Sequence, residues 1–171
     1  MKPQDVLIVL KLLASGWPGS YAALGQKIGL SASEAHAALR RAQQSGLVHP
    51  NSNRPNKSAL AEFLLHGLKY VFPAQPGPSS RGMPTSFAAP PLAGEFISQA
   101  SSADENILVW PDPEGEHRGY ELKPLCRSVP KAARNDPKLY EWLVLADALR
   151  SGRARERELA AKIVGERLLS V

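Results

Sequence analysis

Apolar residues recur at helical spacing on both sides of a short turn in segment 20–48. Before the turn they form one face of a helix that Ser20 can cap and that Gly29 can end in the left-handed conformation. After the turn, Ser31 and Glu34 match a capping box, so a second helix is predicted to begin directly after Ser31. The inward-facing residues are Ala23, Leu24, Ile28, Ala35, Ala38, Leu39 and Ala42. The pattern predicts a helix-turn-helix.

Helical periodicity continues on both sides of this pair. Residues 3–15 carry a broad apolar face and are predicted to form a buried support helix, and residues 58–72 are predicted to form a fourth helix with a surplus apolar face for a dimer. Segment 49–57 is polar and contains two prolines but no alternating apolar pair, which argues against a full two-stranded wing. Residues 1–72 are therefore expected to form a degenerate winged-helix domain.

The composition of the chain changes after residue 72. Six prolines, interleaved with Gly and Ser, lie between residues 73 and 91 and disfavour regular structure. Because apolar residues such as Met83 and Phe87 lie among them, we expect residues 73–106 to form an irregular arm that wraps over a surface. Residues 92–100 are a candidate short helix within this arm.

Residues 107–171 are predicted to form a β-hairpin followed by two helices that serve dimerisation or partner binding. Strand-like runs at 107–110 and 120–125 flank a loop of turn-forming residues, and this ribbon is a candidate replacement for the wing. Two helices follow, one beginning at Asp136-Pro137 and one spanning about 153–168. The fold class expected from the whole chain is mainly α.

The composition of the chain argues against a disulfide-rich, zinc-thiolate or membrane-spanning protein. The chain has 171 residues, of which 43% are hydrophobic, enough to bury the core of one domain with an appendage. Its single cysteine, Cys126, can build neither a disulfide framework nor a thiolate zinc site within one chain. The apolar run at residues 6–10 is too short for a membrane span or signal sequence. We therefore expect a cytoplasmic protein without membrane contact, cofactor or metal.

The excess positive charge lies in the N-terminal part of the chain. Residues 1–75 contain eight Lys and Arg residues against three acidic ones, and the remaining 96 residues contain thirteen of each sign. The whole net charge of +5 therefore accompanies the helix-turn-helix, as attraction to phosphates requires. The alternative interpretation of this uneven charge distribution is an ordinary basic surface.

The second helix of a helix-turn-helix is the element that enters the major groove of DNA. With the apolar stripe turned inward, the expected base contacts are Ser33, His36, Ala37, Arg40 and Gln44, with Arg40 suited to a bidentate contact with guanine. The expected phosphate contacts are Ser20, Tyr21, Arg41, Arg54 and Lys57. We therefore predict a transcriptional regulator that binds double-stranded DNA as a homodimer on two half-sites. A helical core without DNA contact is the alternative.

Residues 3–72 resemble the DNA-binding part of bacterial winged-helix regulators of the broad MarR type. The resemblance rests on Leu24-Gly25, Gly29-Leu30-Ser31, Leu39 and Gly46-Leu47-Val48, the last being where such proteins enter the wing. It implies major-groove binding and a regulatory role, and this chain departs from the family at the wing. The C-terminal part, including Arg81-Gly-Met-Pro84 and Trp110-Pro-Asp-Pro113, is similar to small bacterial proteins labelled as such regulators without a known target.

Two other functions remain open. An antitoxin-like or adaptor protein would bind a protein partner through its C-terminal region. There the charge-dense residues 147–158 form either a solvated or self-paired face or an intersubunit or partner surface. A metal-dependent nuclease is suggested by Pro111-Asp112 and Glu121-Leu122-Lys123, but Glu121 and Lys123 alternate with apolar residues as on the wet face of a strand. We therefore predict no enzymatic activity and no catalytic residues.

Overall fold

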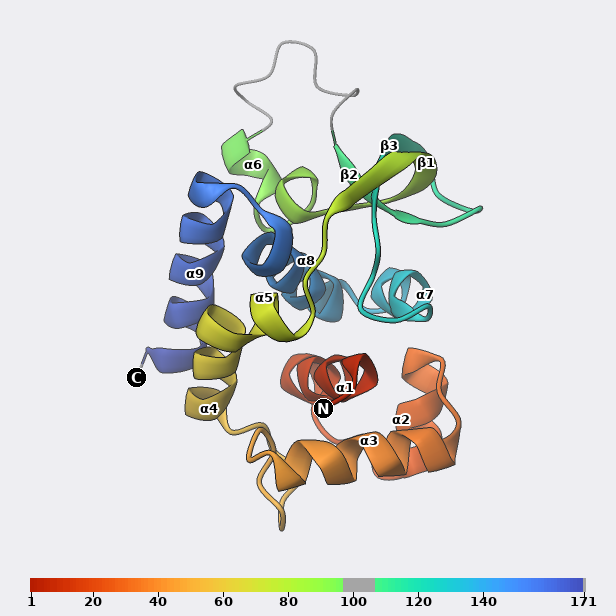
Figure 1. Ribbon diagram of the computed structural model, residues 1–171. Coiled ribbons are helices and arrows are strands. Elements are labelled where there is room, and N and C mark those ends of the chain that lie inside the picture. The colour runs from red at the N-terminus through yellow and green to blue at the C-terminus, as the bar shows by residue number, and fades with distance from the viewer. Residues whose placement is uncertain (97–106, 171) are drawn as a thin grey trace.

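The structure is a computed structural model that describes residues 1–96 and 107–170 (Figure 1). Within this part of the chain the fold is mainly helical, with one small sheet of three strands, which confirms the expected class. The helices are α1 (Pro3–Ser15), α2 (Tyr21–Ile28), α3 (Ala32–Gln44), α4 (Lys57–Glu62), α5 (Leu68–Val71), α6 (Ala93–Phe96), α7 (Val129–Arg134), α8 (Pro137–Ser151) and α9 (Ala154–Leu169). A π-helical turn, η1 (Phe63–Gly67), joins α4 to α5, and a 3-10 turn, η2 (Ser86–Ala88), follows the first strand. The strands are β1 (Pro76–Thr85), β2 (Leu108–Pro111) and β3 (His117–Leu122).

The helix-turn-helix geometry of α2 and α3 follows from local capping chemistry. The Ser20 hydroxyl accepts a hydrogen bond from the Ala23 amide at 3.1 Å, and Gly29 ends α2 in the left-handed conformation with φ of 72°. The Ser31 amide donates to Glu34 Oε2 at 2.8 Å, and the Glu34 amide donates to Ser31 Oγ at 3.2 Å. The capping box is thereby closed in both directions and fixes the start of α3 where the sequence predicted it.

Helix α1 lies between α3 and α8 and is covered on both sides (Figure 1). Every residue from Asp5 to Leu12 is buried, including Asp5 and Lys11. A helix that is apolar around most of its circumference is suited to this position, because each side faces another helix rather than water. The expected support helix is confirmed. A continuous cluster of buried apolar side chains among the described residues extends through α1 into both halves of the chain.

Residues 49–56 form a tight loop in place of a wing. A single bridge pairs Val48 with Pro55, and the His49 amide donates to the Arg54 carbonyl at 2.9 Å. Gln43 Nε2 ties the loop to α3 by donating to the Pro50 carbonyl at 3.2 Å and to the side chain of Asn53 at 3.0 Å. The loop agrees with the expectation that the chain lacks a full two-stranded wing in this segment.

The expectation of an irregular arm over residues 73–106 is wrong for its first part, because residues 76–85 form strand β1. Its N-terminal portion pairs antiparallel with β3, and its C-terminal portion, residues 82–85, pairs antiparallel with β2. Prolines are tolerated because most of β1 has a neighbour on one side only, so that a missing amide hydrogen need not break a ladder on both sides. The candidate helix at 92–100 is present as α6, and residues 97–106 lie outside the described residues.

The predicted β-hairpin at 107–125 is also wrong in its pairing. Both β2 and β3 exist, but each pairs antiparallel with β1, so the two run parallel to one another, with Leu108 opposite Tyr120. The three strands close into a small barrel. Gly82 permits the close approach of β1 and β2, because a Cβ at this position would lie 1.9 Å from the Trp110 carbonyl oxygen.

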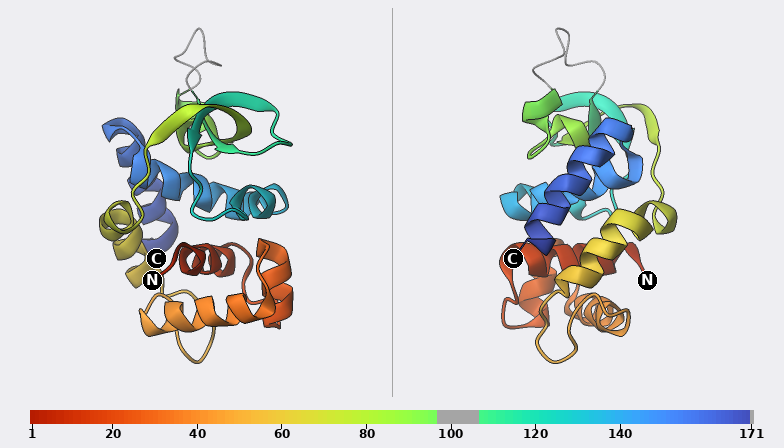
Figure 2. Two further views of the ribbon diagram at one scale, coloured as in Figure 1. Left: turned by 45° about the vertical axis from the view of Figure 1, so that its right-hand side comes forward. Right: turned by 90° about the vertical axis from the view of Figure 1, so that its left-hand side faces the viewer.

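The two predicted C-terminal helices are confirmed as α8 and α9. Asp136 caps α8 by accepting a hydrogen bond from the Leu139 amide at 3.1 Å, and Pro137 occupies the first helical position. Asp136 also forms an ion pair with Lys11, which links the start of α8 to α1. Helix α8 packs against α1, α7 and α9, and α9 packs against α4 (Figure 2). No helix in residues 1–96 and 107–170 is long and apolar enough to cross a membrane.

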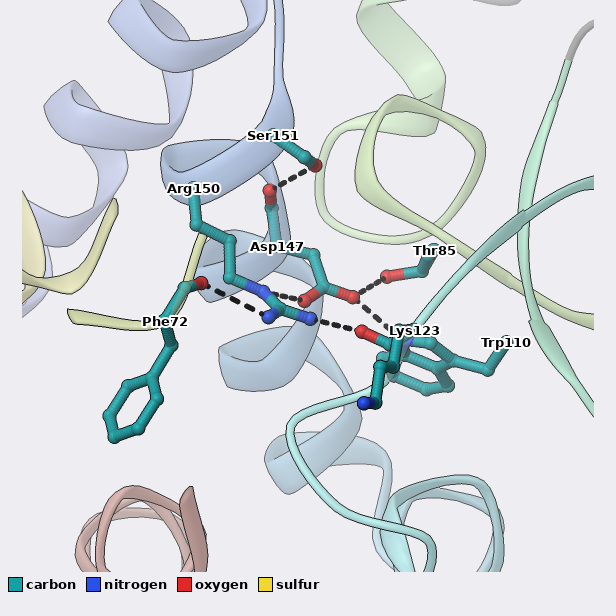
Figure 3. A network of polar contacts seen from close by, with 7 residues as sticks. All are labelled: Phe72, Thr85, Trp110, Lys123, Asp147, Arg150 and Ser151. Atoms are coloured by element: carbon teal, nitrogen blue, oxygen red, sulfur yellow. Dashed lines mark hydrogen bonds and ion pairs between the residues drawn. The ribbon is translucent and has the colours of Figure 1, made fainter. Parts of the chain in front are cut away.

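A buried polar network fastens the barrel to α8 (Figure 3). Asp147 Oδ2 accepts hydrogen bonds from Thr85 Oγ1 at 2.7 Å and from Trp110 Nε1 at 2.6 Å, and Asp147 Oδ1 accepts one from Arg150 Nε at 2.8 Å. Arg150 then donates to the Lys123 carbonyl at 2.5 Å. A solvated face is wrong for Asp147 and Arg150, which are buried at the meeting point of α8 and the barrel. The two side chains pair with each other, as the self-paired alternative expected.

Candidate nucleic-acid interface

The outer face of α3 carries the residues that the sequence assigned to base contacts. Ser33, His36, Arg40 and Gln44 are exposed, and Ala37 is half-buried. The opposite stripe, Ala35, Ala38, Leu39 and Ala42, is buried against the rest of the helical core. Figure 1 shows α3 along one end of the molecule, with no other element beyond its outer side except the loop at residues 49–56. These five side chains therefore share one solvent-facing surface.

The start of α3 is held by a charged cap. The hydrogen bonds from the Ser31 amide and hydroxyl to Glu34 lower the pKa of the Glu34 carboxyl below its usual value. An ionised carboxylate in the first turn interacts favourably with the helix dipole. Ser33, which lies between the two capping residues, therefore has a fixed position at the N-terminal end of the exposed face.

Arg41 does not point freely to solvent as a simple phosphate contact would. Its Nε donates to both carboxylate oxygens of Asp5 at 3.0 Å, and its Nη2 donates to Asp5 Oδ1 at 2.7 Å. These hydrogen bonds raise the pKa of Arg41, and the Arg41 side chain retains 31% of its exposure. The fork-like pair anchors α3 to α1. Sequence reasoning missed Asp5 as the partner because the two residues are 36 positions apart.

Aromatic rings connect α2 to the outer face of α3. The ring centroids of Tyr21 and His36 lie 4.7 Å apart with an interplanar angle of 80°, and Trp17 packs edge-on against Tyr21 at 5.2 Å. Edge-to-face contacts of this kind restrict ring orientation. The hydroxyl of Ser20 is already engaged as the cap of α2. Ser20 and Tyr21 lie at the N-terminus of α2. The ring of Tyr21 contacts His36 and thereby reaches the exposed face of α3.

Arg54 and Lys57 extend this surface beyond α3. Both are exposed; Arg54 lies in the loop at residues 49–56 and Lys57 begins α4. Two views show this loop projecting past α3 at the same end of the molecule (Figures 1 and 2). Residues 20–57 contain five basic side chains and one acidic side chain, and that acid is the capping Glu34. Segment 20–57 therefore carries an excess of positive charge, and Arg40, Arg54 and Lys57 are exposed.

The acidic residues of the nuclease-like pattern do not form a metal site among the described residues. Asp112 forms an ion pair with Arg134, which also pairs with Glu114 at 2.7 Å. Glu121 lies on β3 opposite Val109. In residues 1–96 and 107–170, no group of three or more His, Cys, Asp or Glu side chains is arranged to hold a metal ion. Asp112 therefore serves as a partner of α7.

Comparison of the chain with protein-family models, with curated proteins and with solved structures finds no match. The function of the α3 surface is therefore inferred from its own geometry and charge.

Proposed function

We propose that this protein is a sequence-specific regulator that binds double-stranded DNA, with α3 in the major groove as in winged-helix regulators of the broad MarR type. The observation that carries the proposal is the exposed face of α3, which presents Ser33, His36, Arg40 and Gln44 on a helix whose start is fixed by a capping box. A recognition helix uses such outward side chains to contact base edges.

Each residue of the interface has a specific role in this proposal. Arg40 forms a bidentate contact with a guanine, and Ala37 packs against a thymine methyl group. Arg54 and Lys57 contact phosphates from the loop side, while Ser20 and Tyr21 contact phosphate at the N-terminus of α2. Arg41 reaches phosphate with the exposed part of a guanidinium that Asp5 holds in place.

A homodimer would place two copies of α3 on two half-sites about one helical turn apart. The support for a second copy is the exposed apolar end of α5, where Tyr70 is 75% exposed and Val71 is 49% exposed. Light scattering on the purified protein should give the mass of a dimer. Tyr70→Ser should shift the equilibrium toward monomer, whereas a monomeric wild-type protein at the concentrations used for DNA binding would contradict the dimer.

The DNA proposal is tested by selecting genomic fragments with the purified protein and measuring their affinity by fluorescence anisotropy. Arg40→Ala should lower the affinity for a selected fragment by about 1–3 kcal/mol and reduce the preference over unrelated DNA. Lys57→Ala should weaken all sequences alike and reduce the slope of log K against log salt by about 1.

Lys162→Ala is the matched control, because Lys162 is an exposed residue of α9 outside the α3 surface. It should leave both affinity and salt slope unchanged. Absence of binding to every fragment at low salt would refute the proposal, as would an Arg40→Ala protein that selects the same sequences with the same affinity.

A further inference from the structure

A cavity of about 700 Å³ opens between the barrel, α6 and the start of α9. Its apolar wall is formed by Phe87, Phe96, Leu108 and Tyr120, which come from four different elements. The rings of Phe87 and Phe96 meet edge-on with centroids 6.4 Å apart. Tyr120 is 42% exposed, which is high for a large aromatic side chain. A volume of this size and an aromatic wall are typical of small-molecule sites.

The polar edge of this cavity carries one charge of each sign. Arg153 and Glu156, at the N-terminal end of α9, both line it. Arg153 is exposed, whereas Glu156 is only 9% exposed and its Oε2 accepts a hydrogen bond from the Arg153 amide at 2.9 Å. A ligand with a single charge would bring a like charge close to one of these groups. A ligand that carries both charges satisfies both.

We propose that this cavity binds a free α-amino acid with an aromatic or large apolar side chain. The guanidinium of Arg153 pairs with the ligand carboxylate in the two-pronged geometry that suits these groups. The Glu156 carboxylate accepts hydrogen bonds from the ligand ammonium, and the rings of Phe87, Phe96 and Tyr120 enclose the ligand side chain. The start of α9 and the barrel lie at the end of the molecule opposite α3, so this site is separate from the DNA interface (Figure 1).

Isothermal titration calorimetry with L-phenylalanine and L-tryptophan tests the proposal, with two analogues that each lack one charge. Phenethylamine lacks the carboxylate, and 3-phenylpropionate lacks the ammonium group. The amino acids should bind, and each analogue should bind about tenfold or more weakly, because each loses one charged hydrogen-bonded contact. Equal affinity for L-phenylalanine and either analogue would overturn the proposal, as would the absence of binding at millimolar concentrations of both amino acids.

Two variants assign the binding to this cavity. Arg153→Ala should weaken L-phenylalanine binding about tenfold but should not weaken phenethylamine binding, because only the amino acid has a carboxylate. Tyr120→Ala should weaken both ligands, whereas Tyr70→Ala removes an exposed tyrosine on α5 and should weaken neither. Circular dichroism checks that each variant is folded. A Tyr70→Ala protein that loses binding as Tyr120→Ala does would refute this location. The assay contains no DNA, so its failure leaves the proposed DNA binding untouched.

Discussion

The substitution Arg41→Ala is expected to destabilise the fold by about 3 kcal/mol, although Arg41 is a partly exposed residue. The Asp5 carboxylate is fully buried and accepts hydrogen bonds from Arg41 at 2.7, 3.0 and 3.0 Å and from the Lys2 amide at 2.7 Å. Loss of one partner of a buried ion pair costs about 3–5 kcal/mol, because an unpaired charge remains inside. Since 31% of the Arg41 side chain is exposed, water can enter its place, and we expect the lower end of this range.

Urea unfolding followed by circular dichroism at pH 7 measures this cost. The double variant Asp5→Asn/Arg41→Ala should lose less stability than the sum of the two single variants, because no buried charge remains without its partner. The neighbouring Arg40→Ala is the matched control; Arg40 is exposed, and its loss should change stability by less than about 0.5 kcal/mol. If Arg41→Ala costs no more than Arg40→Ala, the pair with Asp5 does not hold α3 against α1.

Three further contacts give testable changes in the free energy of unfolding. Burial raises the pKa of Asp136, but hydrogen bonds and the charge of Lys11 outweigh it and lower that pKa from 3.8 to about 2, so the wild type should lose about 1–2 kcal/mol between pH 5 and pH 2 that Asp136→Asn does not lose. Ser31→Ala should cost about 1 kcal/mol by removing the α3 cap. Asp147→Asn should cost about 2–3 kcal/mol, because the Trp110 indole loses its charged acceptor.

Two of these three variants have controls at residues of the same type in other surroundings, and Asp136→Asn is compared with the wild type. Equal acid sensitivity in wild type and Asp136→Asn would contradict a lowered pKa at that carboxyl. Ser33→Ala removes an exposed serine from the same helix turn, and a cost equal to that of Ser31→Ala would show that the cap is not responsible. Asp112→Asn loses an ion pair with a partly exposed arginine and should cost less than about 1 kcal/mol. If Asp112→Asn lowered the free energy of unfolding as much as Asp147→Asn does, burial would not explain the cost of losing Asp147.

The features that depend on residues close together in the sequence were predicted correctly. The cap at Ser20, the left-handed Gly29 and the Ser31–Glu34 box involve groups within four positions of one another, and each is present. Asp136-Pro137 marked the start of α8 for the same reason. The exposed face of α3 followed directly, because fixing the start and the buried stripe of a helix also fixes which side chains point outward.

Sequence reasoning failed where structure depends on distant partners. The prolines of segment 76–85 disfavour a strand locally, yet β1 forms because β2 and β3 pair with it from 23 or more positions away. The two later strands have the spacing of a hairpin, and nothing in their own residues indicates that they pair parallel to each other and antiparallel to β1. Helix α7 was not predicted at all. The cavity was missed because its walls come from separate elements, while Arg153 and Glu156 read locally as part of a charge-dense surface.

The buried ion pairs of α1 explain how the helix-turn-helix is joined to the rest of the chain. Asp5, near its start, binds Arg41 of α3, and Lys11, near its end, binds Asp136 at the start of α8. Between these two charges, each residue from Val6 to Leu10 is fully buried, so the middle of α1 has no face left for water. The orientation of α3 is therefore set through a helix that also packs against the C-terminal half. The proposed DNA contact on α3 would act on an element whose position depends on α8, so the DNA affinity of this surface should be measured on the full chain.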